Sequence, residues 1–83
     1  MNIEDLREKI LEYYLQEYKE EDSLIKTIQE AKSFYLHSYG ELIVCHLDDR
    51  EQVLPFAVEK EETKKGMKYT RIPIPEIILN NLK

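Results

Sequence analysis

The chain has 83 residues and a formal net charge of −5, from 17 acidic and 12 basic side chains. At this length one domain is expected, and only about 60% of the surface of the unfolded chain can be buried. The single cysteine, Cys45, excludes an intrachain disulfide, and no apolar run approaches the ~20 residues that would cross a bilayer. These totals predict one soluble, cytoplasmic domain over residues 1–83, which a partner subunit would help to stabilise.

Charge is unevenly distributed along the chain. Residues 1–62 carry 16 acidic and 7 basic side chains, whereas residues 63–83 carry 1 and 5. Because the acidic majority repels phosphate, the composition disfavours nucleic acid as the main partner.

The first predicted helix starts after Asn2, a good N-cap, and runs without Gly or Pro to about residue 20. Its apolar and tyrosine side chains cover roughly 200° of the helix circumference, wider than the ~100° stripe of a surface helix. These side chains are Ile3, Leu6, Ile10, Leu11, Tyr13, Tyr14, Leu15 and Tyr18. Either the helix is packed on two sides within the monomer, or part of this arc faces another copy or another protein.

A second helix is predicted for residues 23–39, with Gly40 just beyond its end. Its apolar residues lie within about 140° of arc, with Phe34 outside that arc. The alternative is a strand over residues 33–37 that pairs with residues 42–46, since this segment is rich in residues that favour strands. The helix is preferred because the 3.6-residue pattern continues through the segment.

Residues 41–47 read E-L-I-V-C-H-L and contain the longest unbroken apolar run in the chain, which predicts a buried strand. Residues 48–51 then resemble a capping box of the form D-x-x-E. Because Pro55 stops a helix from continuing, a turn or a single helical turn is expected there.

A β-hairpin is predicted around Lys64, Lys65 and Gly66, taken as a three-residue loop with the glycine in a left-handed conformation. The opposed pairs are then Glu62 with Lys68, Glu59 with Arg71, Val58 with Ile72, and Phe56 with Ile74. A two-residue loop of Lys65 and Gly66 would place Lys60 opposite Arg71, so the first register is preferred. Its apolar pairs would bury one face of the hairpin base.

Pro73 ends the strand pairing, and Pro75 suits the first residue of a short closing helix. Ile77, Ile78 and Leu82 are expected to pack back onto the sheet. Together the elements predict an α+β fold: an antiparallel two-helix hairpin packed on a small, about three-stranded antiparallel sheet, with a short C-terminal helix.

The residue types that carry catalysis and metal binding are few. Cys45 and His46 are adjacent in the predicted strand and therefore point to opposite faces, and with His37 they match no zinc-ligand spacing. The carboxylate clusters lie in predicted loops or exposed strand positions, and two glycines do not make a phosphate-binding loop. The sequence therefore predicts no enzyme, no catalytic residue, no metal and no cofactor.

The predicted hairpin carries the basic and aromatic residues Lys64, Lys65, Lys68, Tyr69 and Arg71. The segment that follows, R-I-P-I-P-E-I-I-L-N-N-L, resembles the strand-then-helix segment of ribbon-helix-helix and swapped-hairpin repressors. The resemblance covers residues 71–82 and implies a homodimeric nucleic-acid-binding regulator, which is the alternative function. The segment departs from that pattern at Pro73, which lacks a backbone donor.

The leading hypothesis is a small acidic protein–protein interaction module. It depends on the wide arc of the first helix and on an acidic face formed by the helix connection and residues 48–51. The residues predicted to contact the partner are Tyr13, Tyr14, Glu17, Tyr18, Glu20, Glu21 and Asp22. By class-level analogy such a protein is a regulator or inhibitor of phage or mobile-element type that occupies a basic surface of its partner, and a homodimer is expected.

Overall fold

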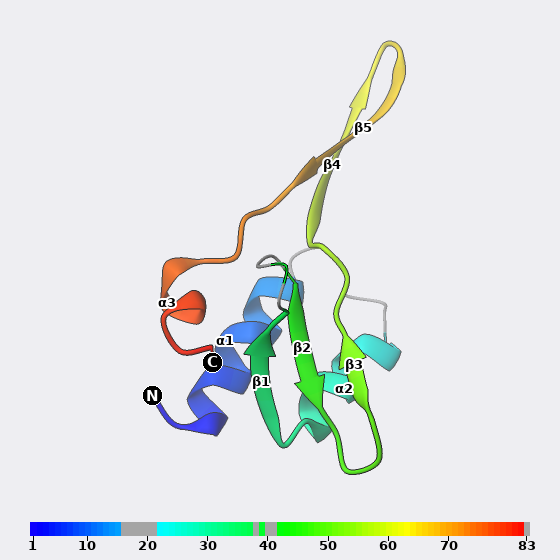
Figure 1. The fold of residues 1–83 in the computed structure, drawn as a ribbon. Coiled ribbons are helices and arrows are strands. Elements are labelled where there is room, and N and C mark those ends of the chain that lie inside the picture. The colour runs from blue at the N-terminus through cyan, green and yellow to red at the C-terminus, as the bar shows by residue number, and fades with distance from the viewer. Residues whose placement is uncertain (16–21, 38, 40–41, 83) are drawn as a thin grey trace.

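The computed structural model describes residues 1–15, 22–37, 39 and 42–82. Within them the fold is α+β, with three helices and two antiparallel sheets, of strand order β1-β2-β3 and β4-β5 (Figure 1). The helices are α1 (Ile3–Leu15), α2 (Asp22–Glu30) and α3 (Glu76–Leu79). The strands are β1 (Ser33–Leu36), β2 (Ile43–His46), β3 (Glu51–Val53), β4 (Val58–Thr63) and β5 (Gly66–Arg71).

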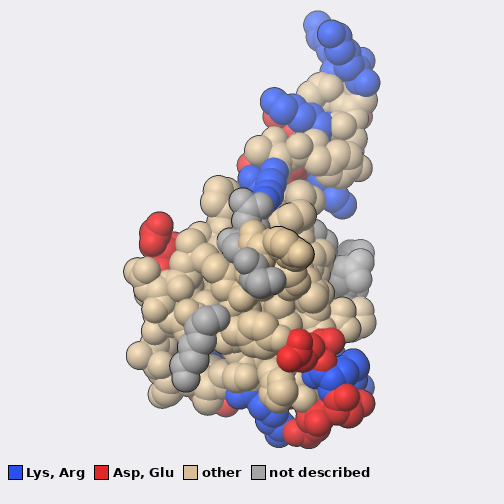
Figure 2. Space-filling view, viewed as in Figure 1, with Lys and Arg blue, Asp and Glu red and all other residues tan. Residues whose placement is uncertain are grey.

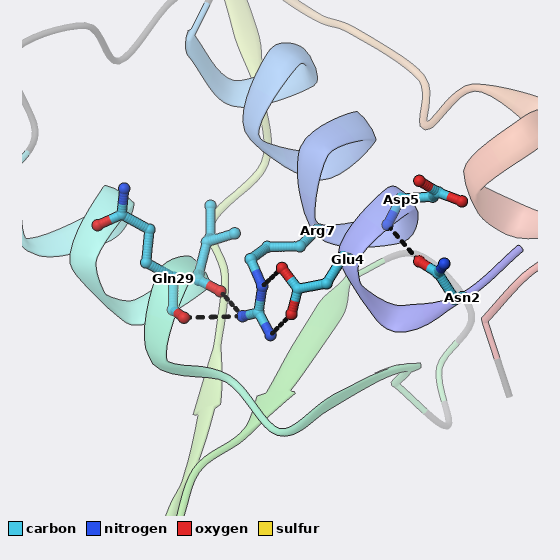
Figure 3. Close-up of polar contacts among 6 residues, drawn as sticks. Asn2, Glu4, Asp5, Arg7 and Gln29 are labelled. Atoms are coloured by element: carbon cyan, nitrogen blue, oxygen red, sulfur yellow. Dashed lines mark hydrogen bonds and ion pairs between the residues drawn. The ribbon is translucent and has the colours of Figure 1, made fainter.

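Helix α1 begins where the sequence predicts. The Asn2 side chain caps it, because its Oδ1 accepts a hydrogen bond from the backbone N–H of Asp5 at 2.8 Å (Figure 3). Glu4 and Asp5 occupy the first turn, at the positive end of the helix dipole. The predicted continuation to residue 20 lies outside the described residues.

Helix α2 ends at Glu30, so the predicted helix over residues 23–39 is wrong in its second half. The alternative strand is correct: β1 pairs with β2, with Phe34 opposite Cys45. The reason lies in Phe34, which falls outside the apolar arc of the helical pattern but is only 4% exposed as a strand residue. Burial of an aromatic side chain outweighs a helical pattern that would leave it in water.

The predicted turn at residues 48–51 is confirmed, without a helical turn. A bend covers residues 48 and 49, the backbone N–H of Leu47 donates to the carbonyl of Arg50 at 2.8 Å, and Glu51 already pairs with His46 as the first residue of β3. Pairing with β2 brings the backbone N–H of Leu54 to the carbonyl of Ile43 at 2.8 Å and buries Leu54 to 1% exposure. A helix limited by Pro55 to about one turn offers no comparable burial.

The core lies between the helices and one face of the three-stranded sheet (Figure 1). Its buried members are Leu6, Ile10, Tyr13, Tyr14, Ile28, Ala31, Phe34, Ile43, Cys45, Leu47, Leu54, Ala57 and Ile78. The two members from β2, Ile43 and Cys45, are two residues apart, as burial on one face of a strand requires. The antiparallel pairing of α1 and α2 as a hairpin stays a prediction.

Arg7 connects three elements of this body (Figure 3). Its Nη1 donates to the carbonyls of Ile28 and Gln29 at 2.6 and 2.9 Å, in the last turn of α2. Its guanidinium also contacts the carboxylate of Glu4 and lies 5.8 Å from the ring centroid of Phe34. Helix α2 has no basic residue in its own last turn, so Arg7 supplies the positive charge that stabilises this end.

None of the described helices covers the opposite face of the sheet, yet this face contains one well-buried residue. Val44 is 2% exposed, although it points away from the core. Tyr35 lies opposite Val44 in the register, on the same face of the sheet as Glu51 of β3. Hydrogen bonding to the Glu51 carboxylate is the main cause that raises the pKa of Tyr35.

Strands β4 and β5 form a hairpin that projects from the body and extends the molecule to 44 × 25 × 22 Å (Figure 1). The predicted register is wrong by one residue: Thr63 pairs with Gly66 across a two-residue turn, and Glu61, not Glu62, opposes Lys68. The register is set at the base, where the carbonyl of buried Ala57 accepts from the N–H of Ile72 at 2.8 Å. At the other end Gly66 adopts a φ of +118°, which a glycine tolerates best.

The predicted burial of the hairpin base is correct only in part: Ile72 and Ile74 pack against the core and Val58 is half-buried. The ladder ends at Val58 and Arg71, so Phe56 and Ile74 do not pair, and Phe56 remains 41% exposed. Helix α3 begins at Glu76, with Pro75 as its N-cap, one residue later than predicted.

Helix α3 packs against α1, and its Ile78 joins the core cluster that also contains Phe34 and Ile43 of the sheet. Ile78 is buried and Leu82 lies against the core, as predicted, but Ile77 is 48% exposed. The short helix therefore holds the C-terminal segment to the body through one apolar side.

Candidate functional site

The projecting hairpin, residues 58–71, is the most accessible part of the described structure and is called the arm below. Every arm residue with a described burial is exposed except Val58, which is half-buried. The arm carries five basic and three acidic side chains, a balance of +2, while the rest of the chain carries 7 and 14, a balance of −7. A weakly basic ribbon therefore extends from an acidic body.

The two faces of the arm differ in character, because directly opposed residues share a face. One face carries Val58, Lys60, Glu62, Met67, Tyr69 and Arg71. The other carries Glu59, Glu61, Thr63, Lys68 and Thr70. All of the aromatic and aliphatic side chains of the arm are thus on the first face, which is called the apolar face of the arm below.

On this apolar face the large side chains lie in water. Tyr69 is 61% exposed and Met67 is 50% exposed. At the arm's base the guanidinium of Arg71 lies 3.9 Å from the ring centroid of Phe56, a close cation–π contact. Lysine and arginine side chains occupy the outer end of the arm in Figure 2, where Lys64 and Lys65 form the turn.

Two tyrosines of α1 hold the segments that lead into and out of the arm. The hydroxyl of Tyr13 donates to the carbonyl of Ile72 at 2.5 Å, and that of Tyr14 donates to the carbonyl of Pro55 at 2.8 Å. Their rings pack edge to face, with centroids 4.9 Å apart. The arm is therefore fixed to the body at its base, whereas residues 59–71 are exposed to solvent.

This arrangement corrects the predicted use of helix 1 as a partner-binding surface. Tyr13 and Tyr14 are 6% and 2% exposed, so the chain's own core covers the tyrosines that made the apolar arc seem too wide. In the described part of α1, Ile3 and Leu15 are the exposed members of that arc, at 37% each, and Leu11 is half-buried. The hydroxyls find backbone carbonyls on segments about 40 to 60 residues away, contacts that helical periodicity does not indicate.

Most of the other residues predicted to contact the partner lie outside the described ranges. Glu17, Tyr18, Glu20 and Glu21 are not among the described residues, and Asp22 is described only as the first residue of α2. The structure does describe the acidic turn at Asp48 and Asp49. Its charges are exposed and partly balanced, since Asp48 lies 3.9 Å from Lys32 and Asp49 lies 3.1 Å from Arg50.

Strand β3 presents a second accessible feature. It is the last strand of its sheet, and its three residues are all exposed, with Val53 at 42%. An open groove of about 500 Å³ runs between it and the start of α2. Its lining includes Leu24, Thr27, Val53, Leu54 and Pro55. The sequence did not predict this edge, because two polar residues followed by a valine show no alternation of polar and apolar side chains.

Cys45 and His46 point to opposite sides of β2, as predicted. Burial is the main cause that raises the pKa of the Cys45 thiol to about 12, so the thiolate is disfavoured at neutral pH. His46 is exposed on the outer face, and His37 stacks on Tyr39 with ring centroids 5.1 Å apart. In the described ranges no group of three or more His, Cys, Asp or Glu side chains could hold a metal ion.

Among the described helices, none has the length and apolar character needed to span a membrane. Comparison with protein-family models, with curated proteins and with solved structures gave no match.

Proposed function

We propose that this protein is a small interaction module that acts by occupying the surface of a partner protein, and that the arm is its main binding element. The observation that carries the proposal is the amphipathic arm itself. A two-stranded hairpin without a third strand or a covering helix is at best marginally stable in water. Exposed Met67 and Tyr69 on one face of such a hairpin are typical of a surface that a partner covers.

The chemistry of the apolar face of the arm indicates what kind of surface would fit. Tyr69 and Met67 suit an apolar pocket. Tyrosine buries a large area at a small loss of conformational entropy, and the flexible methionine side chain adapts to irregular pockets. Lys60 and Arg71 border them and suit carboxylates at the rim of such a pocket. The acidic body would favour association with a partner that also has a basic region. This agrees with the hypothesis of a regulator or inhibitor that occupies a basic surface of its partner.

A capture experiment with the full chain tests the proposal. The double variant Met67→Ser/Tyr69→Ser removes the exposed apolar side chains, and the matched control Glu59→Gln/Thr70→Ser changes an opposed pair on the other face. We expect the native host's partner to be recovered by the wild type and by the control but not by the first variant. Equal recovery by all three proteins, at unchanged melting temperatures, would remove the arm as the binding element.

The lysine tip favours nucleic acid as a second candidate ligand. Lys64 and Lys65 lie at the outer end of the arm (Figure 2), and Tyr69 could stack on a base. Few cations against a body of balance −7 give weak, salt-sensitive attraction. A fluorescence titration with single- and double-stranded oligonucleotides at low salt tests it, and absence of binding at tens of micromolar protein would eliminate this candidate.

A further inference from the structure

Strand β3 lies at the edge of its sheet, and the backbone groups on its outer side are placed to pair with another strand. The N–H of Leu54 donates to the carbonyl of Ile43, so even-numbered residues of this strand direct their backbone groups to β2. Because antiparallel pairing alternates, Glu51 and Val53 direct theirs outward, where the Val53 carbonyl accepts a long, exposed bond of 3.3 Å from the Gln52 side chain that an incoming strand would replace. Both side chains are exposed.

Strand β4 of the arm has the same kind of edge. The N–H of Ile72 donates to the carbonyl of Ala57, so the odd-numbered residues of β4 face β5. The backbone groups of Val58, Lys60 and Glu62 therefore point away from the hairpin. The described structure thus contains two strand edges with complementary hydrogen-bonding needs.

The arm is held away from the β3 edge of its own chain (Figure 1). Leu54 and Ala57, at the two ends of the connection between β3 and β4, are 1% and 0% exposed. The hydroxyl of Tyr14 also holds the carbonyl of Pro55. Since the connection is fixed against the core at these points, the arm leaves the body without turning back along β3.

We propose that the β3 edge receives β4 from a second copy of this chain, in a reciprocal exchange of arms. This inference rests on the proposed function of the arm as a binding element. In the antiparallel register Glu51 lies opposite Lys60 of the second copy and Val53 lies opposite Val58, one charge pair and one apolar pair. A shift of two residues would instead oppose Glu51 to Glu62, so the side chains select the first register.

The exchanged strands would form one continuous sheet on each side of the dimer. Tyr35, Val44 and Val53 already form a row across the outer face of β1, β2 and β3. Val58 of the second copy continues this row, which gives the exposed Val53 an apolar neighbour. A two-fold axis makes the exchange reciprocal, so each arm pairs with the β3 edge of the other copy and both edges are paired.

Charge favours a second copy as the occupant. In the antiparallel register the tip of the arm, Lys64 and Lys65, reaches the turn at Asp48 and Asp49 of the other copy. Each arm has a balance of +2 and each remaining body a balance of −7, so arm and body attract one another between copies. A nucleic acid has no strand edge to pair with β3 and would meet the same acidic turn.

Analytical ultracentrifugation of the full chain over about a hundredfold range of concentration tests the inference. Lys60→Glu and Glu51→Lys each place like charges opposite one another at two sites per dimer, and each should raise the dimer Kd by about a hundredfold. The combined variant Glu51→Lys/Lys60→Glu restores opposite charges and should recover dimerisation. Lys26→Glu, the same change in charge on the exposed surface of α2, is the control and should leave the Kd unchanged.

Amide hydrogen exchange provides a second measurement. As the fraction of dimer rises with protein concentration, we expect slower exchange at the amides of Glu51, Val53, Val58 and Lys60. The Lys60→Glu variant should show no such change. A wild type that remains monomeric at the highest concentration, or a combined variant that does not recover, would overturn the exchange of arms. If that monomer still captured another protein through Met67 and Tyr69, the proposed function would stand and only the identity of the occupant would be wrong.

Discussion

Replacement of Arg7 by methionine tests whether this side chain fastens α1 to the end of α2. Arg7 is 15% exposed and donates to two carbonyls, those of Ile28 and Gln29. A hydrogen bond to a charged group contributes about 1.5–3 kcal/mol, and methionine keeps most of the packing over Phe34, so we expect a loss of about 3 kcal/mol. For a chain of this size that lowers the melting temperature by roughly 12–24 °C.

Glu4→Gln is the matched control for this prediction. It removes the 3.4 Å ion pair with Arg7, but the Glu4 side chain is 74% exposed, so solvent screening limits the loss to less than about 1 kcal/mol. Urea and thermal unfolding followed by circular dichroism give both values. If Arg7→Met cost no more than Glu4→Gln, the bonds to the α2 carbonyls would not stabilise the fold, and the argument for Arg7 would be wrong.

Three further predictions concern single groups. Cys45 should react with a thiol reagent at pH 8 at least about a hundredfold more slowly in the folded protein than in urea, because its pKa is about 12 when folded. Equal reactivity in the folded and unfolded states would contradict this burial of the thiol. The unfolded thiol has a pKa near 9.0 and loses its proton first, so the free energy of unfolding should fall from pH 9 towards pH 12. The fall should be smaller in Cys45→Ala. Tyr14→Phe removes the bond to the Pro55 carbonyl and should cost about 1 kcal/mol in urea titrations, whereas no loss would mean that the bond is not formed in solution. Gly66→Ala meets no atom within 4 Å, so its cost of roughly 1–2 kcal/mol comes from the backbone at φ +118°. Amide exchange should then quicken in the arm but not in the body, and a lower melting temperature of the whole protein would refute that independence.

The two helices and the arm illustrate different limits of sequence reasoning. The start of α1 is a local matter, because the Asn2 side chain and the first-turn carboxylates act within one turn. The end of α2 is not local: the segment after Glu30 satisfies both a helical and a strand pattern, and the burial of Phe34 against β2 decides between them. The hairpin was predictable, but its register was not, because it is set by Ala57 and Ile72 at the base and not by the charges near the turn.

The candidate site was the least predictable feature. Period-two alternation of Met67, Tyr69 and Arg71 was present in the sequence, but alternation does not reveal whether a face is covered. Conversely, the tyrosines of α1 had the composition of an interface and proved to be anchors inside the body. Accessible surface depends on which distant segments meet, whereas periodicity and composition act over a few neighbouring residues.

By itself the sequence determined an acidic α+β chain with a buried central strand, a capped first helix and a basic hairpin. These properties follow from composition, from periodicity and from turn chemistry, all of which act over a few residues. Only the tertiary structure decided that the segment after α2 is a strand, that Tyr13 and Tyr14 are enclosed, and that the hairpin projects from the body. Each of these depends on competition for one limited core, where a long-range contact outweighs the local preference of the residues that make it.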